Sequence, residues 1–203
     1  IRLSLVGSEM CIRDRAYSVE IYEEWARKKG LHAEEVERQK DLLRMAAMLH
    51  DVGKVGISDV ILRKPSRLNL DEYEIMKAHT YLGARLFRNM QSDLDEVSFL
   101  VALNHHERWD GTGYPGHMDL LSNLSPGGTA GNPGGFKPKK KDEIPLFGRI
   151  VAVADVYDAL SSRRSYKEPW DEGRVLEEMK NLSGTHFDPD MVCLLYTSDA
   201  ADE

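Results

Sequence analysis

The sequence is short of cysteine, of positive charge and of long apolar runs. It has two cysteines in 203 residues, and Lys and Arg number 27 against 34 Asp and Glu, giving a net charge of −7. A protein that binds duplex nucleic acid needs clustered basic residues, so we expect no duplex nucleic acid as a partner. No apolar stretch approaches the roughly 20 residues of a membrane span, and the first residues lack the apolar stretch of a signal peptide. We therefore expect no membrane segment and a cytoplasmic location.

Both cysteines lie in terminal segments that do not read like native protein. Residues 1–15 and 193–203 resemble translated transposon-type sequencing adapters, so we expect both segments to be adapter-derived. The alternative is an ordinary N-terminal segment and tail. Without these ends no cysteine remains, and disulfide and thiolate chemistry are excluded. Residues 16–192 are then one domain, for which a single core is enough.

Apolar residues recur with helical spacing along most of this domain. The predicted helices cover residues 17–29, 33–49, a segment from Asn69 onward, 97–103, 149–160 and 170–182. The second helix is predicted to bury Leu42, Met45, Ala46 and Leu49. The third starts at a capping signal, Asn69 with Glu72 three residues on, and is predicted to bury Tyr73, Met76, Gly83, Leu86 and Met90.

Metal-ligand residue types stand at the ends of these apolar helices or inside them. They are His50, Asp51, His79, His105, His106 and Asp155. An ionised carboxylate at the edge of a core costs roughly several kcal/mol unless it has a partner, so a cation or a hydrogen-bonding network is expected beside Asp51. Each residue alone could instead be an ordinary hydrogen-bonded core side chain. A mixed imidazole and carboxylate set of this size exceeds the needs of one ion and matches a two-metal hydrolytic centre.

Residues 116–143 break the helical pattern, because glycine and proline recur through the segment and a lysine cluster, 137–141, follows them. We predict a surface loop insertion here. The alternative is a lid whose lysines steer an anionic substrate.

Taken together, the motifs resemble the HD-GYP family, bacterial cyclic-di-GMP phosphodiesterases of the HD superfamily. They are His50-Asp51 with Lys54, His79, His105-His106-Glu107, Asp110-Gly111-x-Gly113-Tyr114-Pro115, Ile144-Pro145-Leu146, Asp155 and the segment 184–189. The resemblance implies an all-α domain, an HD-superfamily helical bundle with a metal site between its helices. It implies hydrolysis of cyclic di-GMP to pGpG, and to GMP by a second cut. Two or three divalent ions are implied, iron first and manganese as the alternative, together with an upstream sensory or receiver domain in the parent protein.

The resemblance also assigns roles residue by residue. His50, His79, His105, His106 and Asp155 would be metal ligands, and Asp51 would bridge two ions. Lys54 would face the attacking hydroxide or a phosphate oxygen. Gly113, Tyr114 and Pro115 would shape the lip of the site, and Asp158, Arg164 and Lys167 would hold guanine or phosphate groups.

The sequence departs from the family pattern in three places. The family's further ligand on the first helix falls near residues 10–14, inside the expected adapter, and the loop 116–143 is longer than the common form. The family's last helices are missing after the Phe-Asp-Pro turn, so we expect uncovered apolar surface around Tyr22, Ala26 and residues 175–179. Two other functions stay open: an HD-superfamily phosphohydrolase acting on another nucleotide, and a non-catalytic signalling or binding module.

Overall fold

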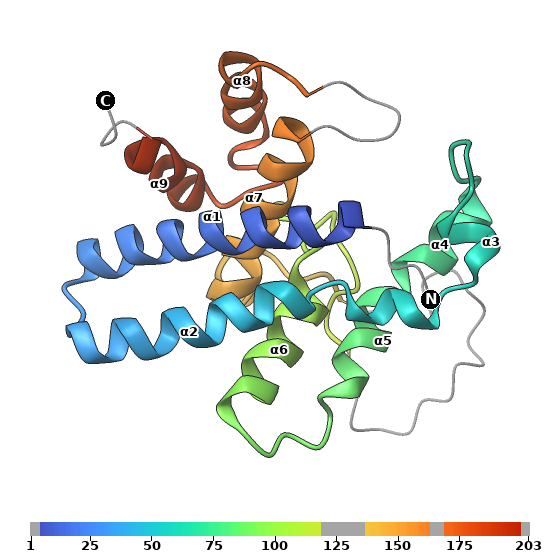
Figure 1. Ribbon diagram of the computed structural model, residues 1–203, viewed down its shortest axis with the longest axis horizontal. Coiled ribbons are helices and arrows are strands. Elements are labelled where there is room, and N and C mark those ends of the chain that lie inside the picture. The colour runs from blue at the N-terminus through green and yellow to red at the C-terminus, as the bar shows by residue number, and fades with distance from the viewer. Residues whose placement is uncertain (1–4, 119–136, 163–168, 200–203) are drawn as a thin grey trace.

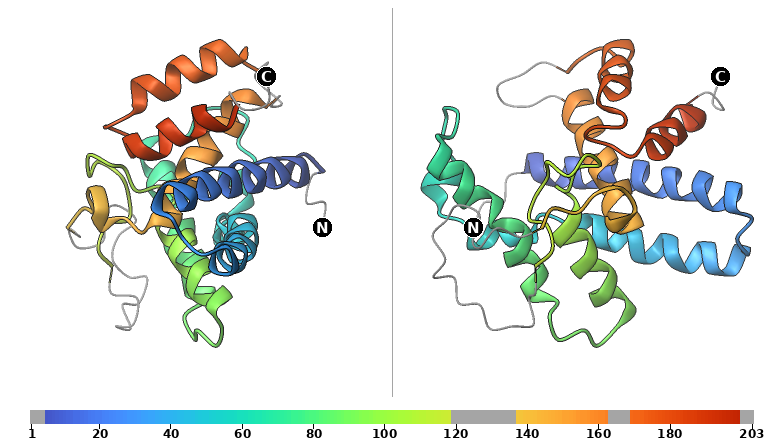
Figure 2. Two further views of the ribbon diagram at one scale, coloured as in Figure 1. Left: turned by 90° about the vertical axis from the view of Figure 1, so that its left-hand side faces the viewer. Right: turned by 180° about the vertical axis from the view of Figure 1, so that it is seen from behind.

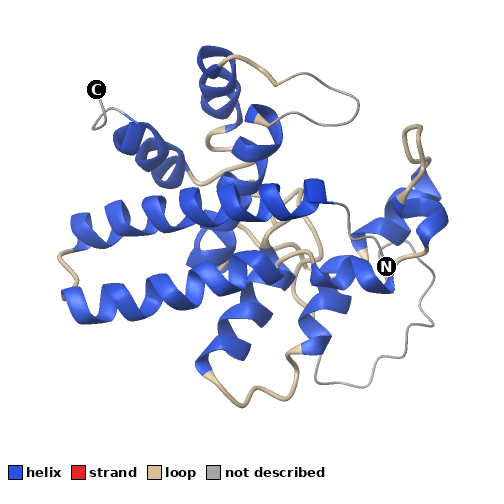
Figure 3. Cartoon of the chain, in the orientation of Figure 1, coloured by secondary structure: helices blue, strands red, loops and turns tan. Residues whose placement is uncertain are grey.

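The computed structural model describes residues 5–118, 137–162 and 169–199, with side chains from Arg15 to Tyr196 within those ranges. Its regular structure there consists of α-helices and short 3₁₀ helices (Figure 3), which confirms the expected all-α fold. The α-helices are α1 (Leu5–Lys29), α2 (Ala33–Leu49), α3 (Asp59–Leu62), α4 (Leu70–Lys77), α5 (His79–Leu86), α6 (Asp93–Asn104), α7 (Leu146–Ser161), α8 (Glu172–Leu182) and α9 (Pro189–Asp199). The 3₁₀ helices are η1 (Val52–Gly56) and η2 (Lys141–Glu143).

Helices α1 and α2 form a long antiparallel hairpin, and α6, α7 and α9 pack against it (Figure 1). Gly30 follows α1 with a φ of 66°, a left-handed conformation that glycine adopts readily. Helix α7 contacts α1, α6, α8 and α9, and buries Ile150, Val151 and Val153 completely. Helix α7 is therefore central to the core.

The helix predicted to start at Asn69 is in fact two helices. Its start is confirmed: Asn69 Oδ1 accepts from the Glu72 amide at 2.8 Å, and the Asn69 amide donates to the Glu72 carboxylate at 2.8 Å. The chain then breaks at Ala78, between α4 and α5. A continuous buried stripe cannot pass through that break, so the prediction is wrong for Tyr73, Leu86 and Met90, which are 45%, 59% and 45% exposed.

The buried face of α2 is also displaced from the predicted one. Ala46 is buried as expected, but Met45 is 40% exposed and Leu43 and Ala47 are buried instead. The reason is that α2 packs against both α1 and α6, so its buried side turns toward two neighbours rather than one.

The expectation of uncovered apolar surface is wrong. Tyr22, Ala26, Val175 and Met179 are all 2% exposed or less. Helix α9 lies along α1 on the side away from α2 (Figure 2), and it contributes buried Leu194 and Leu195 to the same core. The adapter origin of residues 1–15 and 193–203 remains a prediction.

The predicted loop insertion falls largely on residues 119–136, outside the described part. Its two flanks are paired, since the His117 amide donates to the Lys137 carbonyl oxygen at 2.9 Å. Lys139 is buried and its Nζ donates to Asn104 Oδ1 on α6, so this lysine is not available to steer a ligand. None of the described helices combines the length and the apolarity needed to cross a bilayer.

Candidate metal centre

Three helix ends bring the predicted ligands together. Helix α2 ends just before His50 and Asp51, α5 begins at His79, and α6 ends just before His105 and His106. Asp51, His79, His105 and His106 each offer one ligand atom, and these atoms all lie within 4.8 Å of one another. Residues up to 55 positions apart in the sequence therefore form one compact donor set.

Gly53 makes this convergence possible. A Cβ atom at this position would lie 1.9 Å from the His79 carbonyl oxygen and 2.4 Å from the Gly83 amide nitrogen. Glycine at this position lets η1 approach the backbone of α5 closely. This contact fixes the distance between Asp51 and His79.

The imidazole rings are oriented by backbone carbonyl groups three residues earlier in the chain. Nδ1 of His79 lies 2.7 Å from the Met76 carbonyl oxygen, and Nδ1 of His105 lies 3.0 Å from that of Ala102. A carbonyl oxygen only accepts, so each Nδ1 carries the proton and each Nε2 presents a lone pair. The two Nε2 atoms lie 3.3 Å apart, an arrangement that suits two ligands of one cation.

Asp51 is an anion with one oxygen unused by hydrogen bonding. Its Oδ1 is buried and accepts no hydrogen bond within the described ranges, although it lies 3.4 Å from His79 Nε2. Its Oδ2 accepts from Lys54 Nζ and lies 3.4 Å from His50 Nε2. Burial opposes ionisation, but His50 and Lys54 hold the pKa of Asp51 well below its usual value. A buried carboxylate oxygen facing imidazole lone pairs fits a bound divalent cation.

The pKa values of the clustered histidines and of His50 are shifted in opposite directions. Burial lowers the pKa of His105 and His106, that of His106 to about 3, so both rings are neutral and able to bind metal. For His50 burial also disfavours the charged ring, but the carboxylates of Asp51 and Asp155 outweigh it and raise its pKa to about 9. His50 is thus the ring that a cation would have to deprotonate.

The two predicted aspartates of α7 lie in different surroundings. Asp155 is partly buried and close enough to His50 to raise its pKa, but it is not one of the four clustered residues. Asp158 is completely buried, and its Oδ1 accepts from Ser162 Oγ at 2.8 Å. Arg164 and Lys167 lie outside the described residues.

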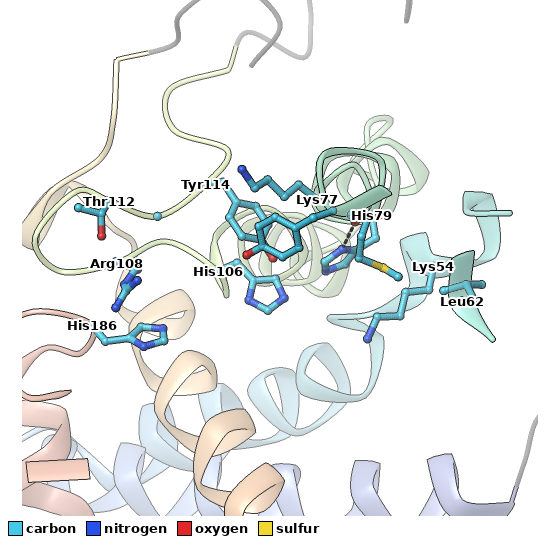
Figure 4. Close-up of a pocket in the computed structure, with 12 residues that line it drawn as sticks. Lys54, Leu62, Lys77, His79, His106, Arg108, Thr112, Tyr114 and His186 are labelled. Atoms are coloured by element: carbon cyan, nitrogen blue, oxygen red, sulfur yellow. Dashed lines mark hydrogen bonds between the residues drawn. The ribbon is translucent and has the colours of Figure 1, made fainter. Parts of the chain in front are cut away.

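A cavity of about 650 Å³ opens beside the cluster (Figure 4). Of the predicted site residues, Lys54, His79, His106, Gly113 and Tyr114 line it. The sequence reasoning missed five polar or aromatic lining residues: Tyr73, Lys77, Arg108, Thr112 and His186. Arg108, Thr112 and His186 lie inside or beside the quoted motifs, which could have flagged them. Tyr73 and Lys77 carried no such signal.

The Gly113-Tyr114-Pro115 turn forms one wall of this cavity. The Tyr114 amide donates to the His106 carbonyl oxygen at 3.1 Å, and the Tyr114 ring stacks on the His106 ring with centroids 4.9 Å apart. Gly113 is required, because a Cβ there would lie 2.2 Å from the Arg108 amide nitrogen. Pro115 follows through a cis peptide bond. The turn is therefore packed directly on the metal-ligand segment.

These features define the class of the protein. The chain belongs to the HD domain family, whose model matches residues 18–160, and a second HD domain model matches residues 130–191. The relatives described next support the resemblance to the HD-GYP type.

The curated relatives are bacterial phosphodiesterases. The chain is 42% identical over 164 residues to the cyclic di-GMP phosphodiesterase response regulator RpfG of Xanthomonas campestris, covering 81% of this chain and 37% of that protein. It is 41% identical over 150 residues to a cyclic di-GMP phosphodiesterase of Thermotoga maritima, covering 74% and 35%. It is 39% identical over 159 residues to the 3'3'-cGAMP-specific phosphodiesterase 2 of Vibrio cholerae, covering 78% and 26%. The chain thus spans about a quarter to two fifths of the length of these relatives.

A solved structure shares the fold. The crystal structure of a cyclic GMP-AMP-specific phosphodiesterase of V. cholerae superposes with a TM-score of 0.60 at 21% identity, covering 95% of this chain and 44% of that chain.

Proposed function

We propose that this chain is a metal-dependent phosphodiesterase that hydrolyses cyclic di-GMP to pGpG and, by a second cut, to GMP. The observation that carries the proposal is the cluster of Asp51 with three histidines beside a cavity that also exposes Lys54. The names of the relatives support the same substrate class. Because the chain spans a minor part of those proteins, the activity is a proposal for this chain.

We propose that two or three divalent ions bind here, iron first and manganese as the alternative, as the resemblance to the HD-GYP family implies. Asp51, His79, His105 and His106 would hold them, with His50 and Asp155 completing the set and Asp51 bridging. Divalent ions bound at such a site supply Lewis acidity and activate water.

The chain's own residues would then bind and orient the substrate. Lys54 pairs with Asp51 at the edge of the cavity, where its ammonium can turn to a phosphate oxygen and neutralise developing charge. The Tyr114 ring, stacked on His106, would shape the lip of the site. Arg164 and Lys167 are proposed to hold guanine or phosphate groups. Asp158, whose Oδ1 accepts from Ser162 Oγ, is proposed to share that role.

A second candidate substrate is 3'3'-cGAMP, because one of the relatives is specific for it. An HD phosphohydrolase acting on another nucleotide, and a non-catalytic module, are the remaining alternatives. Cyclic di-GMP is an intracellular messenger, so we place the activity in the cytoplasm and expect an upstream sensory or receiver domain in the parent protein.

The test is a hydrolysis assay of the purified chain loaded with Fe(II) or Mn(II). Cyclic di-GMP, 3'3'-cGAMP and cyclic di-AMP are each incubated with it, and the products are separated by anion-exchange chromatography. We expect metal-dependent release of pGpG that a chelator abolishes. Bound metal together with no hydrolysis of any cyclic dinucleotide would contradict the proposal and favour the non-catalytic module.

A further inference from the structure

The cavity has a polar end that the metal chemistry does not use. Arg108, Thr112 and His186 line it together on one side of His106, and Lys54 lies on the other side (Figure 4). A cyclic dinucleotide whose scissile phosphate lies at the metal cluster must place a further part of its structure along this cavity. The chemistry of these side chains indicates which part that is.

One donor of the Arg108 guanidinium has no partner within the described ranges. Its Nε atom is buried and makes no hydrogen bond there, and Arg108 lines the cavity. Buried donors in folded proteins are nearly always satisfied, so an orphaned one on a cavity wall indicates a ligand that supplies acceptors. The planar guanidinium favours a ligand with two acceptors side by side.

His186 is held firmly beside Arg108 by the backbone. The Trp109 amide donates to the His186 carbonyl oxygen at 3.0 Å, and the Asp110 amide donates to that of Thr185 at 2.9 Å. The imidazole stacks on the Phe187 ring, with centroids 4.3 Å apart. Burial, and then the charge of Arg108, lower the pKa of His186 to about 4. At neutral pH the ring therefore offers one donor and one acceptor.

A carboxylate near this end disfavours a second phosphate. Asp110 Oδ1 accepts from the Thr112 amide at 2.8 Å and from Thr112 Oγ1 at 2.7 Å. Burial opposes ionisation of Asp110, but these hydrogen bonds and then the charge of Arg108 lower its pKa. This negative charge would repel an incoming anion, whereas it would not repel a neutral base. Guanine presents O6 and N7 as paired acceptors, which arginine binds with both arms of its fork, and N1 and N2 as donors.

We propose that Arg108 and His186 form a guanine-selective subsite at the end of the cavity away from the metal cluster. This assignment rests on the proposed function, since it places one base of the cyclic dinucleotide. Arg108 donates to O6 and N7, and the neutral ring of His186 complements the donors of the base. Adenine has a donor where guanine has O6, so Arg108 loses one of its two bonds to that base.

The test compares Arg108→Ala, Arg108→Lys and His186→Ala with the wild type, and Arg85→Ala is the matched control because Arg85 is exposed on α5 and absent from the cavity lining. We expect KM for cyclic di-GMP to rise roughly ten- to hundredfold in both Arg108 variants, with kcat and metal content unchanged. KM for cyclic di-AMP should change little. Arg108→Lys distinguishes a base from a phosphate as the bound group, because lysine keeps the positive charge but lacks the two side-by-side donors of the guanidinium.

A binding measurement tests the proposed subsite independently of hydrolysis. Titration calorimetry on the metal-loaded chain should show GMP binding roughly tenfold more tightly than AMP in the wild type and equally in Arg108→Ala. If no cyclic dinucleotide is hydrolysed, the proposed function fails, and the GMP to AMP ratio still decides the subsite. Equal binding of GMP and AMP by the wild type, full rescue by Arg108→Lys, or loss of metal from the Arg108 variants would each overturn the assignment.

Discussion

The carboxylate of Glu107 accepts a hydrogen bond from the backbone amide of Gly116 at 2.6 Å, and both groups are buried. Glu107 directly follows the proposed ligands His105 and His106, and Gly116 directly follows the cis Tyr114–Pro115 bond. Together with the hydrogen bond from the Tyr114 amide to the His106 carbonyl oxygen, this contact holds the Tyr114 wall of the cavity beside the proposed metal centre. Burial raises the pKa of Glu107.

Glu107→Ala is expected to destabilise the fold by about 1–3 kcal/mol, because the Gly116 amide would be left buried without an acceptor. Glu107→Gln keeps an acceptor oxygen and should lose less stability. Urea unfolding measures both, with Glu177→Ala as a control on the exposed face of α8. An alanine variant as stable as the control would show that the contact does not hold the turn.

Gly53→Ala should damage the fold and the metal site together. The added methyl group would overlap the His79 carbonyl oxygen, so η1 and α5 would have to separate. Gly173→Ala is the matched control: its Cβ would meet one atom, 3.5 Å away, on the exposed side of α8. We expect the control to be more stable than the wild type by up to about 1 kcal/mol. Thermal unfolding and metal analysis on both proteins check this pair, and normal metal content in Gly53→Ala would refute it.

Stability should fall as pH is lowered from about 6.5 to about 4, in part through His186. Its folded pKa is about 4 against an ordinary 6.5, so in this window the unfolded chain binds more protons than the folded chain. The resulting stability is present above pH 6.5 and is lost as pH falls through the window. Melting temperatures at pH 7 and pH 4.5 should therefore differ less in His186→Asn than in the wild type. An unchanged difference would assign the acid sensitivity to other groups.

Local signals were enough for much of the fold. The capping box at Asn69, the glycine stop at Gly30 and the ligands at the ends of α2 and α6 all depend on residues close together in sequence. Such signals define where a helix begins and ends, and hence which side chains it delivers to the centre. The four-residue cluster follows once those ends meet.

What could not be predicted depends on packing between distant segments. The break at Ala78 separates two helices that periodicity alone joins, and the burial of Lys139 depends on a contact with Asn104 on α6. The polar end of the cavity likewise exists because the chain around His186 pairs with the backbone after Arg108. None of these contacts can be predicted from the periodicity of apolar residues in the sequence.

The central claim is that Asp51 anchors a catalytic divalent-metal centre. Asp51→Asn keeps the volume of the side chain and removes its charge, and Asp41→Asn is the control, since Asp41 is exposed and pairs with Arg44. The measurement is metal content by elemental analysis, made together with cyclic-di-GMP hydrolysis on the same samples. The account predicts that Asp51→Asn loses bound metal and hydrolysis together while Asp41→Asn keeps both. Full metal content and full activity in Asp51→Asn would contradict it.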